Sequence, residues 1–123
     1  MPRQRRGWAM RQAENTAIRH SPVMVSLLEP VLLNKIKAGP SYGYSLLTDL
    51  EAINMGTIHP GVVYRTLRDL EALGWIESQW DTDQTQGPPR RTYRLTDQGE
   101  NALNNWKNEL QKVQQVISGL LDQ

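Results

Sequence analysis

The feature that most constrains the fold of this chain is a change of hydrophobic period at Gly74. Before Gly74, apolar residues recur at spacings of three and four, which makes one face of a helix apolar; they are Val63, Leu67, Leu70 and Leu73. After it, the period is two, through residues 76–80 and again through 91–95, as in half-buried strands. Pro60 suits the first turn of the helix, and Gly74 suits the position just past its end. Residues 57–96 are therefore predicted to form a helix followed directly by a two-stranded hairpin.

Two more helices are predicted before this one. The first covers residues 26–38 and is ended by Gly39 and Pro40; either Ser26 caps it or Pro30 occupies its first position. The second runs from about 43 to 53, with Ser41 as its cap. Their predicted buried residues are Leu28, Leu32, Leu33 and Ile36, then Leu46, Leu47, Leu50 and Ile53.

The connection from the second helix to the third is short enough for a helix-turn-helix pair. Thr57 and His59 both precede the third helix. We expect Thr57 to cap it, because threonine is the better capping residue.

A helix-turn-helix followed by a hairpin is the ground plan of a winged helix, an α+β and mostly helical fold. In that fold the third helix enters the DNA major groove, and the hairpin, or wing, reaches the backbone or minor groove beside it. Arg65 and Arg68 lie off the apolar stripe and are candidates for base edges, because arginine pairs with guanine. Candidates for positioning the DNA backbone are Tyr64, Thr66, Arg90, Arg91 and Arg94. Solvation of a surface explains any one arginine as well, but their joint placement on a helix and its wing favours DNA.

Charge is divided unevenly along the chain. Residues 1–20 carry five arginines against one acidic residue, whereas the remainder has nine basic and twelve acidic residues. A basic arm on a mildly acidic body suggests a polyanionic partner. Residues 1–23 are therefore predicted to be a basic N-terminal extension, with part of it helical, that precedes a winged-helix domain at 24–96. Arg5 and Arg6 are candidate DNA contacts; a disordered tail, or a helix that packs on the C-terminal helix, explains the arm equally well.

A long last helix is predicted from its cap, Thr96, to about Leu121. Its apolar residues form an a/d heptad seam: Leu103, Trp106, Leu110, Val113, Ile117 and Leu120. Six such side chains in water would be a large apolar patch on a monomer. Residues 97–123 are therefore expected to be a C-terminal dimerisation helix; the alternative is packing against the N-terminal segment of the same chain.

Four runs of residues closely resemble the PadR family of transcriptional regulators, in order and spacing, over about residues 28–100. They are Gly-Pro-Ser-Tyr-Gly-Tyr at 39–44, Pro-Gly-Val-Val-Tyr at 60–64, Gly-Trp-Ile-Glu at 74–77, and Gly-Pro-Pro-Arg-Arg-Thr-Tyr-Arg-Leu-Thr at 87–96. The resemblance implies a dimeric winged-helix protein, usually a repressor acting on palindromic operators and in many members released by a small molecule. The presence of one C-terminal helix, and not a larger helical domain, resembles the smaller subfamily of these regulators.

By position, Tyr64 matches a recognition-helix tyrosine that contacts the DNA backbone in the resembled family, and Arg90 and Arg91 match basic residues at the wing base. Three positions depart from the family pattern: Tyr42 for a frequent histidine, His59 for a serine and Arg65 for a proline. Arg65 adds a donor to the expected DNA face, whereas the other two departures put the cap and the inter-helix hydrogen bonds in question.

The resemblance also suggests an effector. In some members aromatic residues between the C-terminal helices bind planar compounds, so Trp106 with Trp8 is a candidate site for a small planar effector. The alternative is that Trp106 is only a seam residue of the dimer.

Nothing in the sequence favours an enzyme. The two histidines lack a paired metal-ligand spacing, and the chain has no Gly-rich phosphate loop, nucleophile elbow or cysteine. No metal, cofactor or membrane association is expected, and a cytoplasmic location fits the absence of cysteine and of a long apolar run. The expected partners are double-stranded DNA and a second copy of the chain. The alternative function is a winged-helix module that binds another protein.

Overall fold

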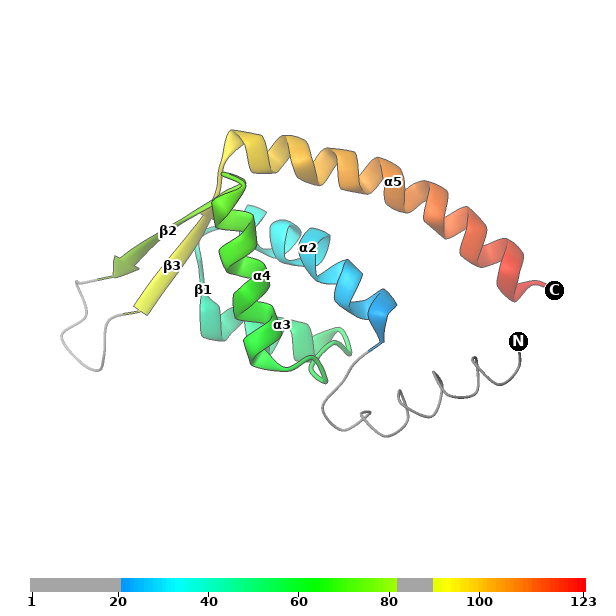
Figure 1. Cartoon of the computed structure of the whole chain (residues 1–123), viewed down its shortest axis with the longest axis horizontal. Coiled ribbons are helices and arrows are strands. Elements are labelled where there is room, and N and C mark those ends of the chain that lie inside the picture. Colours follow the sequence, from blue (N-terminus) through cyan, green and yellow to red (C-terminus); the bar gives the residue numbers. More distant parts are fainter. Residues whose placement is uncertain (1–20, 82–89) are drawn as a thin grey trace.

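The computed structural model describes residues 21–81 and 90–123, and in them four helices pack beside a small sheet that lies at one end of the molecule (Figure 1). The helices are α2 (Pro22–Lys37), α3 (Gly43–Ala52), α4 (Pro60–Ala72) and α5 (Asp97–Leu121). The strands β1 (Ser41–Tyr42), β2 (Ile76–Asp81) and β3 (Arg90–Leu95) pair antiparallel in the order β1-β3-β2. This is a winged helix-turn-helix with a long C-terminal helix, as predicted.

The first core helix begins earlier than either predicted start. Ser21 is its cap, with the side-chain oxygen accepting a hydrogen bond from the Met24 N–H at 3.4 Å, and Pro22 occupies the first turn. Pro30 lies inside the helix and is buried. A proline at an interior position costs the helix one backbone hydrogen bond. Burial of α2 against the core offsets this cost, so the helix continues through Pro30.

Ser41 does not cap α3, contrary to the prediction. Ser41 and Tyr42 instead form β1, which pairs with Tyr93 and Thr92 of β3, and the Ser41 hydroxyl donates to the Gly39 carbonyl at 3.0 Å. Strand pairing with a distant segment therefore takes the residues just before the helix, and Tyr42 stands at the cap position without a side-chain cap bond.

The expected cap of α4 was also wrong, because His59 and not Thr57 holds the helix start. The His59 Nδ1 accepts a hydrogen bond from the Gly61 N–H at 2.9 Å. Pro60 sets the first helical residue, which puts position 59 at the cap, and an unprotonated imidazole nitrogen is a competent acceptor there.

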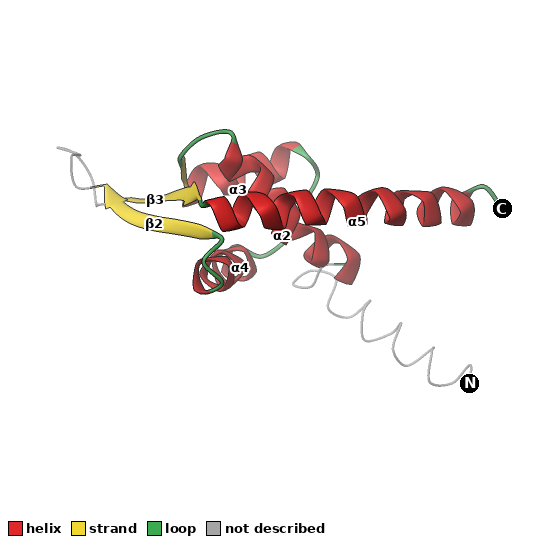
Figure 2. Cartoon of the chain, turned by 90° about the horizontal axis from the view of Figure 1, so that it is seen from above, coloured by secondary structure: helices red, strands yellow, loops and turns green. Residues whose placement is uncertain are grey.

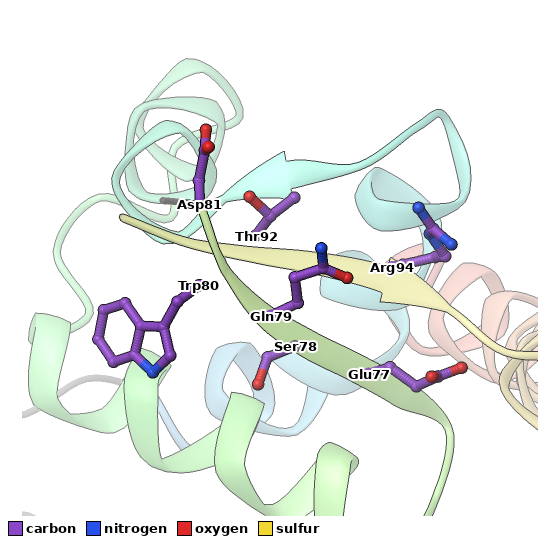
Figure 3. Close-up of a pocket in the computed structure, with 7 residues that line it drawn as sticks. All are labelled: Glu77, Ser78, Gln79, Trp80, Asp81, Thr92 and Arg94. Atoms are coloured by element: carbon purple, nitrogen blue, oxygen red, sulfur yellow. The ribbon is translucent and has the colours of Figure 1, made fainter. Parts of the chain in front are cut away.

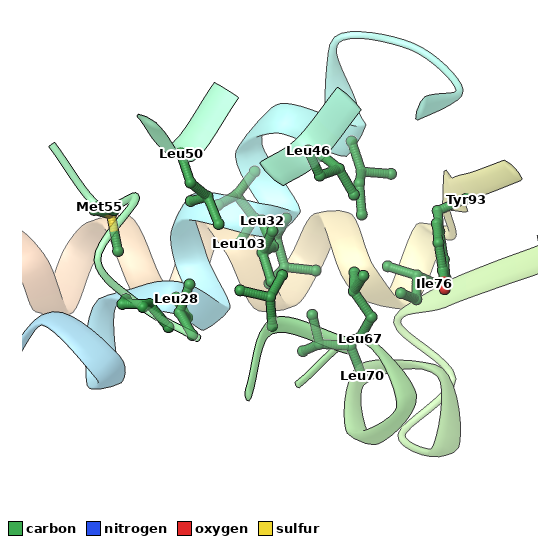
Figure 4. Packing of buried hydrophobic residues seen from close by; sticks show 14 of the residues in the cluster. Leu28, Leu32, Leu46, Leu50, Met55, Leu67, Leu70, Ile76, Tyr93 and Leu103 are labelled. Carbon is green, nitrogen blue, oxygen red and sulfur yellow. The ribbon is translucent and has the colours of Figure 1, made fainter. Parts of the chain in front are cut away.

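The core lies where the helices meet the sheet (Figure 4). It contains most of the predicted residues together with five that the helical stripes did not include: Met55, Ile58, Ile76, Tyr93 and Ala102. Ile53 and Leu73, predicted to be buried, are exposed. Both occupy C-cap positions, where the chain leaves the helix and the apolar stripe no longer applies.

The start of α5 is fixed to the junction between α4 and β2. The Thr96 hydroxyl donates to the Gly74 carbonyl at 2.6 Å and accepts from the Gly99 N–H at 3.0 Å, which confirms Thr96 as the cap. Gly74 has a φ of 80°, as a glycine that ends a helix commonly does. From this joint α5 runs along α2 and extends beyond it (Figures 1 and 2).

Gly99 makes this joint possible, and Gly99→Ala should break it. A Cβ at Gly99 would lie 1.9 Å from the Trp75 carbonyl oxygen and 2.7 Å from Leu95 Cδ1. Since backbone must move to relieve the clash, we expect a loss of roughly 2–3 kcal/mol in the free energy of unfolding, the upper part of the range for overpacking. Gly119→Ala is the matched control, because a Cβ there meets nothing within 4 Å. Urea unfolding of both variants measures the difference; equal midpoints would contradict the role of Gly99.

Candidate nucleic-acid interface

The third helix of the domain presents a basic side to solvent. Tyr64, Arg65 and Arg68 are exposed on α4, opposite the buried Val63 and Leu67. Neither arginine forms a salt bridge with a described residue. Two free guanidinium groups on an exposed helix face are what direct readout of base edges in a major groove requires.

Thr66, the fourth residue predicted on this helix, is turned away from that side. It is half-buried, and its hydroxyl donates to the Val62 carbonyl at 2.9 Å, one turn back. This bond occupies its donor, so Thr66 is the weakest of the predicted contacts on α4.

Tyr64 is held in place by the neighbouring helix. A Cβ at Gly43 would lie 2.8 Å from Tyr64 Cε1, so the ring packs directly on the glycine backbone at the start of α3. The tyrosine remains partly exposed. A ring fixed in this way can present its hydroxyl to a phosphate with little loss of side-chain entropy.

The wing, strands β2 and β3, has two faces set by its register. The inner face carries Ile76, Ser78, Trp80, Arg91, Tyr93 and Leu95, and the outer face carries Glu77, Gln79, Asp81, Arg90, Thr92 and Arg94. The inner face is turned toward α4, because the Ser78 hydroxyl donates to the Glu71 carboxylate at 2.7 Å. Burial on this face raises the pKa of the Tyr93 phenol, and the positive charge of Arg91 opposes that rise.

Arg90 and Arg91 therefore point to opposite faces and have different neighbours. Arg90 Nη1 donates to the Tyr44 hydroxyl at 3.0 Å, and its guanidinium lies 5.0 Å from the Tyr44 ring centroid and 5.7 Å from that of Tyr42. The Arg91 guanidinium lies 4.7 Å from the Trp80 ring centroid. Both arginines remain exposed, and the single hydrogen bond of Arg90 leaves it further N–H donors for a phosphate.

A tyrosine cluster ties the outer face of the wing to α3. The Tyr42 and Tyr44 rings stack 5.5 Å apart, and the Tyr42 hydroxyl donates to Asp81 at 2.8 Å. With Arg90, these contacts fix both wing strands to the helix-turn-helix. The sequence pattern predicts no such role, because contacts between residues 39 and 46 positions apart leave no periodic signal.

Arg94 lies nearer the base of the wing, opposite Glu77 on the outer face. Both residues border a shallow hollow of about 190 Å³ that Asp81 and Thr92 also line (Figure 3). The Glu77 carboxylate opposite the Arg94 guanidinium disfavours a phosphate there. The structure thus separates Arg94 from Arg65 and Arg68. Arg5, Arg6 and Trp8 lie outside the described residues, so their roles stay predictions.

The residues of the predicted dimer seam on α5 differ in how far they are buried in their own chain. Leu103 is 1 % exposed and belongs to the core of its own chain, so it is not available to a partner helix, contrary to the prediction. Trp106 is half-buried, with its indole N–H donating to Glu29 of α2 at 2.8 Å, and Leu110 is half-buried too. The apolar side chains that stay exposed lie in the last turns: Val113, Val116, Ile117, Leu120 and Leu121.

A second hollow, of about 460 Å³, lies along the first half of α5. Trp75 and Trp106 line it together with Gln98, Asn101, Ala102, Asn105 and Glu109. Two indole rings with amide side chains beside them can hold a flat aromatic molecule.

Other site chemistries find no support in the described part of the chain. Residues 21–81 and 90–123 contain no group of three or more histidine and acidic side chains placed to hold a metal ion. None of the helices described is both long and apolar enough to cross a membrane.

The fold and its exposed basic helix define a winged-helix DNA-binding protein. Residues 32–105 match the family of PadR-like transcriptional regulators, which is more than half of the chain, and the protein therefore belongs to that family. It is a DNA-binding transcription regulator and not an enzyme. No curated protein sequence matches the chain.

Solved structures agree with this assignment. A PadR family regulator from Eggerthella lenta DSM 2243 is 27 % identical, with a TM-score of 0.70 over 80 % of this chain and 85 % of that one. A PadR-like regulator from Bacillus cereus is 28 % identical, with a TM-score of 0.72 over 82 % and 97 % of the two chains. The protein smu.1704 from Streptococcus mutans is also 28 % identical, with a TM-score of 0.71 over 85 % and 94 %.

Proposed function

We propose that this regulator is a homodimeric, sequence-specific repressor that binds a two-fold symmetric operator. The observation that carries the proposal is the pair Arg65 and Arg68, exposed on α4 and without an ion pair to any described residue. Each can read a guanine by a bidentate contact in the major groove. Tyr64, Arg90 and Arg91 then contact the phosphates beside the groove and set the register of the helix on the duplex.

The dimer is formed by the exposed apolar residues at the end of α5. Burying a leucine or isoleucine side chain contributes on the order of 1.5–3 kcal/mol, and Leu120 alone is 68 % exposed in one chain. Pairing two such helix ends removes these side chains from water. It also places two copies of α4 on one duplex, with half-sites about 34–36 Å apart if they lie on one face.

A dimer with two copies of α4 on one duplex favours repression over activation of transcription. A dimer that covers two successive major grooves excludes other proteins from the same DNA. An operator that overlaps a promoter is therefore closed to the polymerase while the dimer is bound.

Selection of binding sites from random duplex DNA tests the proposal. We expect the purified protein to enrich an inverted repeat that contains guanine in each half-site, and the same sites should lower transcription when they are placed across a promoter. Enrichment of no sequence, or of single half-sites only, would contradict a dimeric sequence-specific regulator.

A planar effector is a second proposal, favoured by the hollow beside Trp75 and Trp106. A flat aromatic compound bound there would touch α5 next to the Trp106–Glu29 hydrogen bond and so disturb the packing of α5 on α2. Quenching of tryptophan emission by such compounds, lost in Trp106→Phe, is the expected result. If no compound in a broad planar panel quenches the tryptophan emission, the proposal of a planar effector is wrong.

A further inference from the structure

Trp80 is a large aromatic side chain that the fold does not bury. It is 53 % exposed, although Trp75 and Trp106 are half-buried. It lies at the end of β2 that leads to the wing tip, on the inner face of the wing, and Figure 3 shows its ring on the side away from Asp81 and Thr92. The core does not bury this ring, so the ring is accessible to a partner outside the monomer fold.

The residue that accompanies Trp80 indicates the chemistry of that partner. Arg91 stands directly opposite it in the strand register, with its guanidinium 4.7 Å from the indole centroid. An arginine stacked on a tryptophan offers a flat apolar surface and a fixed positive charge side by side. Sugars and phosphates alternate in the same way along a nucleic-acid backbone, whereas an apolar protein partner would leave the charge without a counterpart.

The position of the pair relative to α4 indicates which nucleic acid it meets. The inner face is the one that the Ser78–Glu71 hydrogen bond joins to α4. A duplex whose major groove receives Arg65 and Arg68 therefore passes along the side of the wing that carries Trp80 and Arg91.

We propose that Trp80 is a DNA-contacting residue, with its ring packed on the sugar-phosphate backbone beside the groove and Arg91 held by that ring on the neighbouring phosphate. The inference rests on the proposed function. It gives the two wing arginines different settings: Arg91 contacts a phosphate while it is stacked on Trp80, whereas Arg90 contacts its phosphate while it is held by Tyr42 and Tyr44 of the helix-turn-helix.

The first test follows Trp80 itself. Trp80→Ala should weaken binding of the selected operator about five- to tenfold, toward the low end of what aromatic contacts to nucleic acid contribute. Trp80→Phe keeps a ring and should bind within about twofold of the wild type. Saturating duplex should change the tryptophan emission of the wild type, and Trp80→Phe should lose most of that change. The emission result stands even if Trp80→Ala fails to fold by circular dichroism.

The second test is a pair of double-mutant cycles that combine Trp80→Ala with the loss of one or the other of two neighbouring arginines of β3, Arg91 and Arg90. Trp80→Ala combined with Arg91→Ala should cost less affinity than the product of the two single losses, because Arg91 is no longer placed once the ring is gone. Trp80→Ala combined with Arg90→Ala should give the simple product, since Arg90 lies on the opposite face. The two cycles thus separate a specific pair from a general loss of positive charge.

Three outcomes would overturn the inference. Trp80→Ala could bind the operator as tightly as the wild type, or the emission change could persist in Trp80→Phe. The third is that the loss of affinity in both double mutants equals the product of the two single losses. If binding is lost in Arg65→Ala with Arg68→Ala but is unchanged in Trp80→Ala, only this inference fails. If the wild type binds no duplex at all, the proposed function fails and this inference fails with it.

Discussion

Replacing Arg65 and Arg68 together by alanine should lower the affinity for the selected operator by at least about a hundredfold. Each bidentate arginine–guanine contact contributes about 1–3 kcal/mol of discrimination, and both are lost from each protomer. Binding to unrelated duplex should fall much less, because the phosphate contacts of Tyr64, Arg90 and Arg91 remain. The specificity ratio, measured by fluorescence anisotropy at one salt concentration, should therefore collapse.

The matched control removes the same charge elsewhere. Lys37 forms a half-exposed salt bridge with Glu100, and Lys112 forms an exposed one with Glu109. Such pairs contribute little to stability, so Lys37→Ala with Lys112→Ala should bind the operator nearly as the wild type does. An operator footprint unchanged by the loss of Arg65 and Arg68 would remove α4 from the proposed role.

Ile117→Asp with Leu120→Asp should convert the dimer into a monomer. Both side chains are exposed in the single chain, so burying two carboxylates in the paired helix ends would cost far more than leaving them in water. The operator affinity should fall by roughly a hundredfold to ten-thousandfold, because the second half-site is no longer bound by a tethered partner. The monomeric variant should still fold, because these residues lie outside the core of the winged helix, and its unfolding midpoint should no longer depend on protein concentration.

Gln115→Asp with Ser118→Asp is the control, because it adds the same two charges to the same turns on the outer side of the heptad seam. This variant should remain a dimer and bind normally. If the Ile117 and Leu120 variant also remains a dimer by sedimentation, the apolar end of α5 is not the dimer interface.

Periodicity was enough to predict the order and type of the main elements. The stripe through Val63, Leu67 and Leu70 and the alternation after Gly74 each follow from local geometry, and the structure has α4, β2 and β3 there. Thr96 was identified as a cap because capping also depends on residues close in sequence.

The features that sequence reasoning missed depend on contacts between distant segments. The two-residue strand β1 exists only because β3 lies beside it, and it removes Ser41 from the cap position. Leu103 fits a heptad seam as well as it fits a core, and only the packing of α5 on α2 decides between them. The cluster of Tyr42, Tyr44 and Arg90 likewise joins the start of α3 to the wing, two segments that are far apart in the sequence and that no local pattern connects.

The central claim is that two chains joined by their C-terminal helices place two copies of α4 on one duplex. The mass of the complex with the selected operator, measured by light scattering, tests this claim most directly. The account predicts two chains of 14.1 kDa for each duplex, and a dimer in the absence of DNA. A chain that stays monomeric at working concentration, or that binds no duplex even in dilute salt, would contradict it.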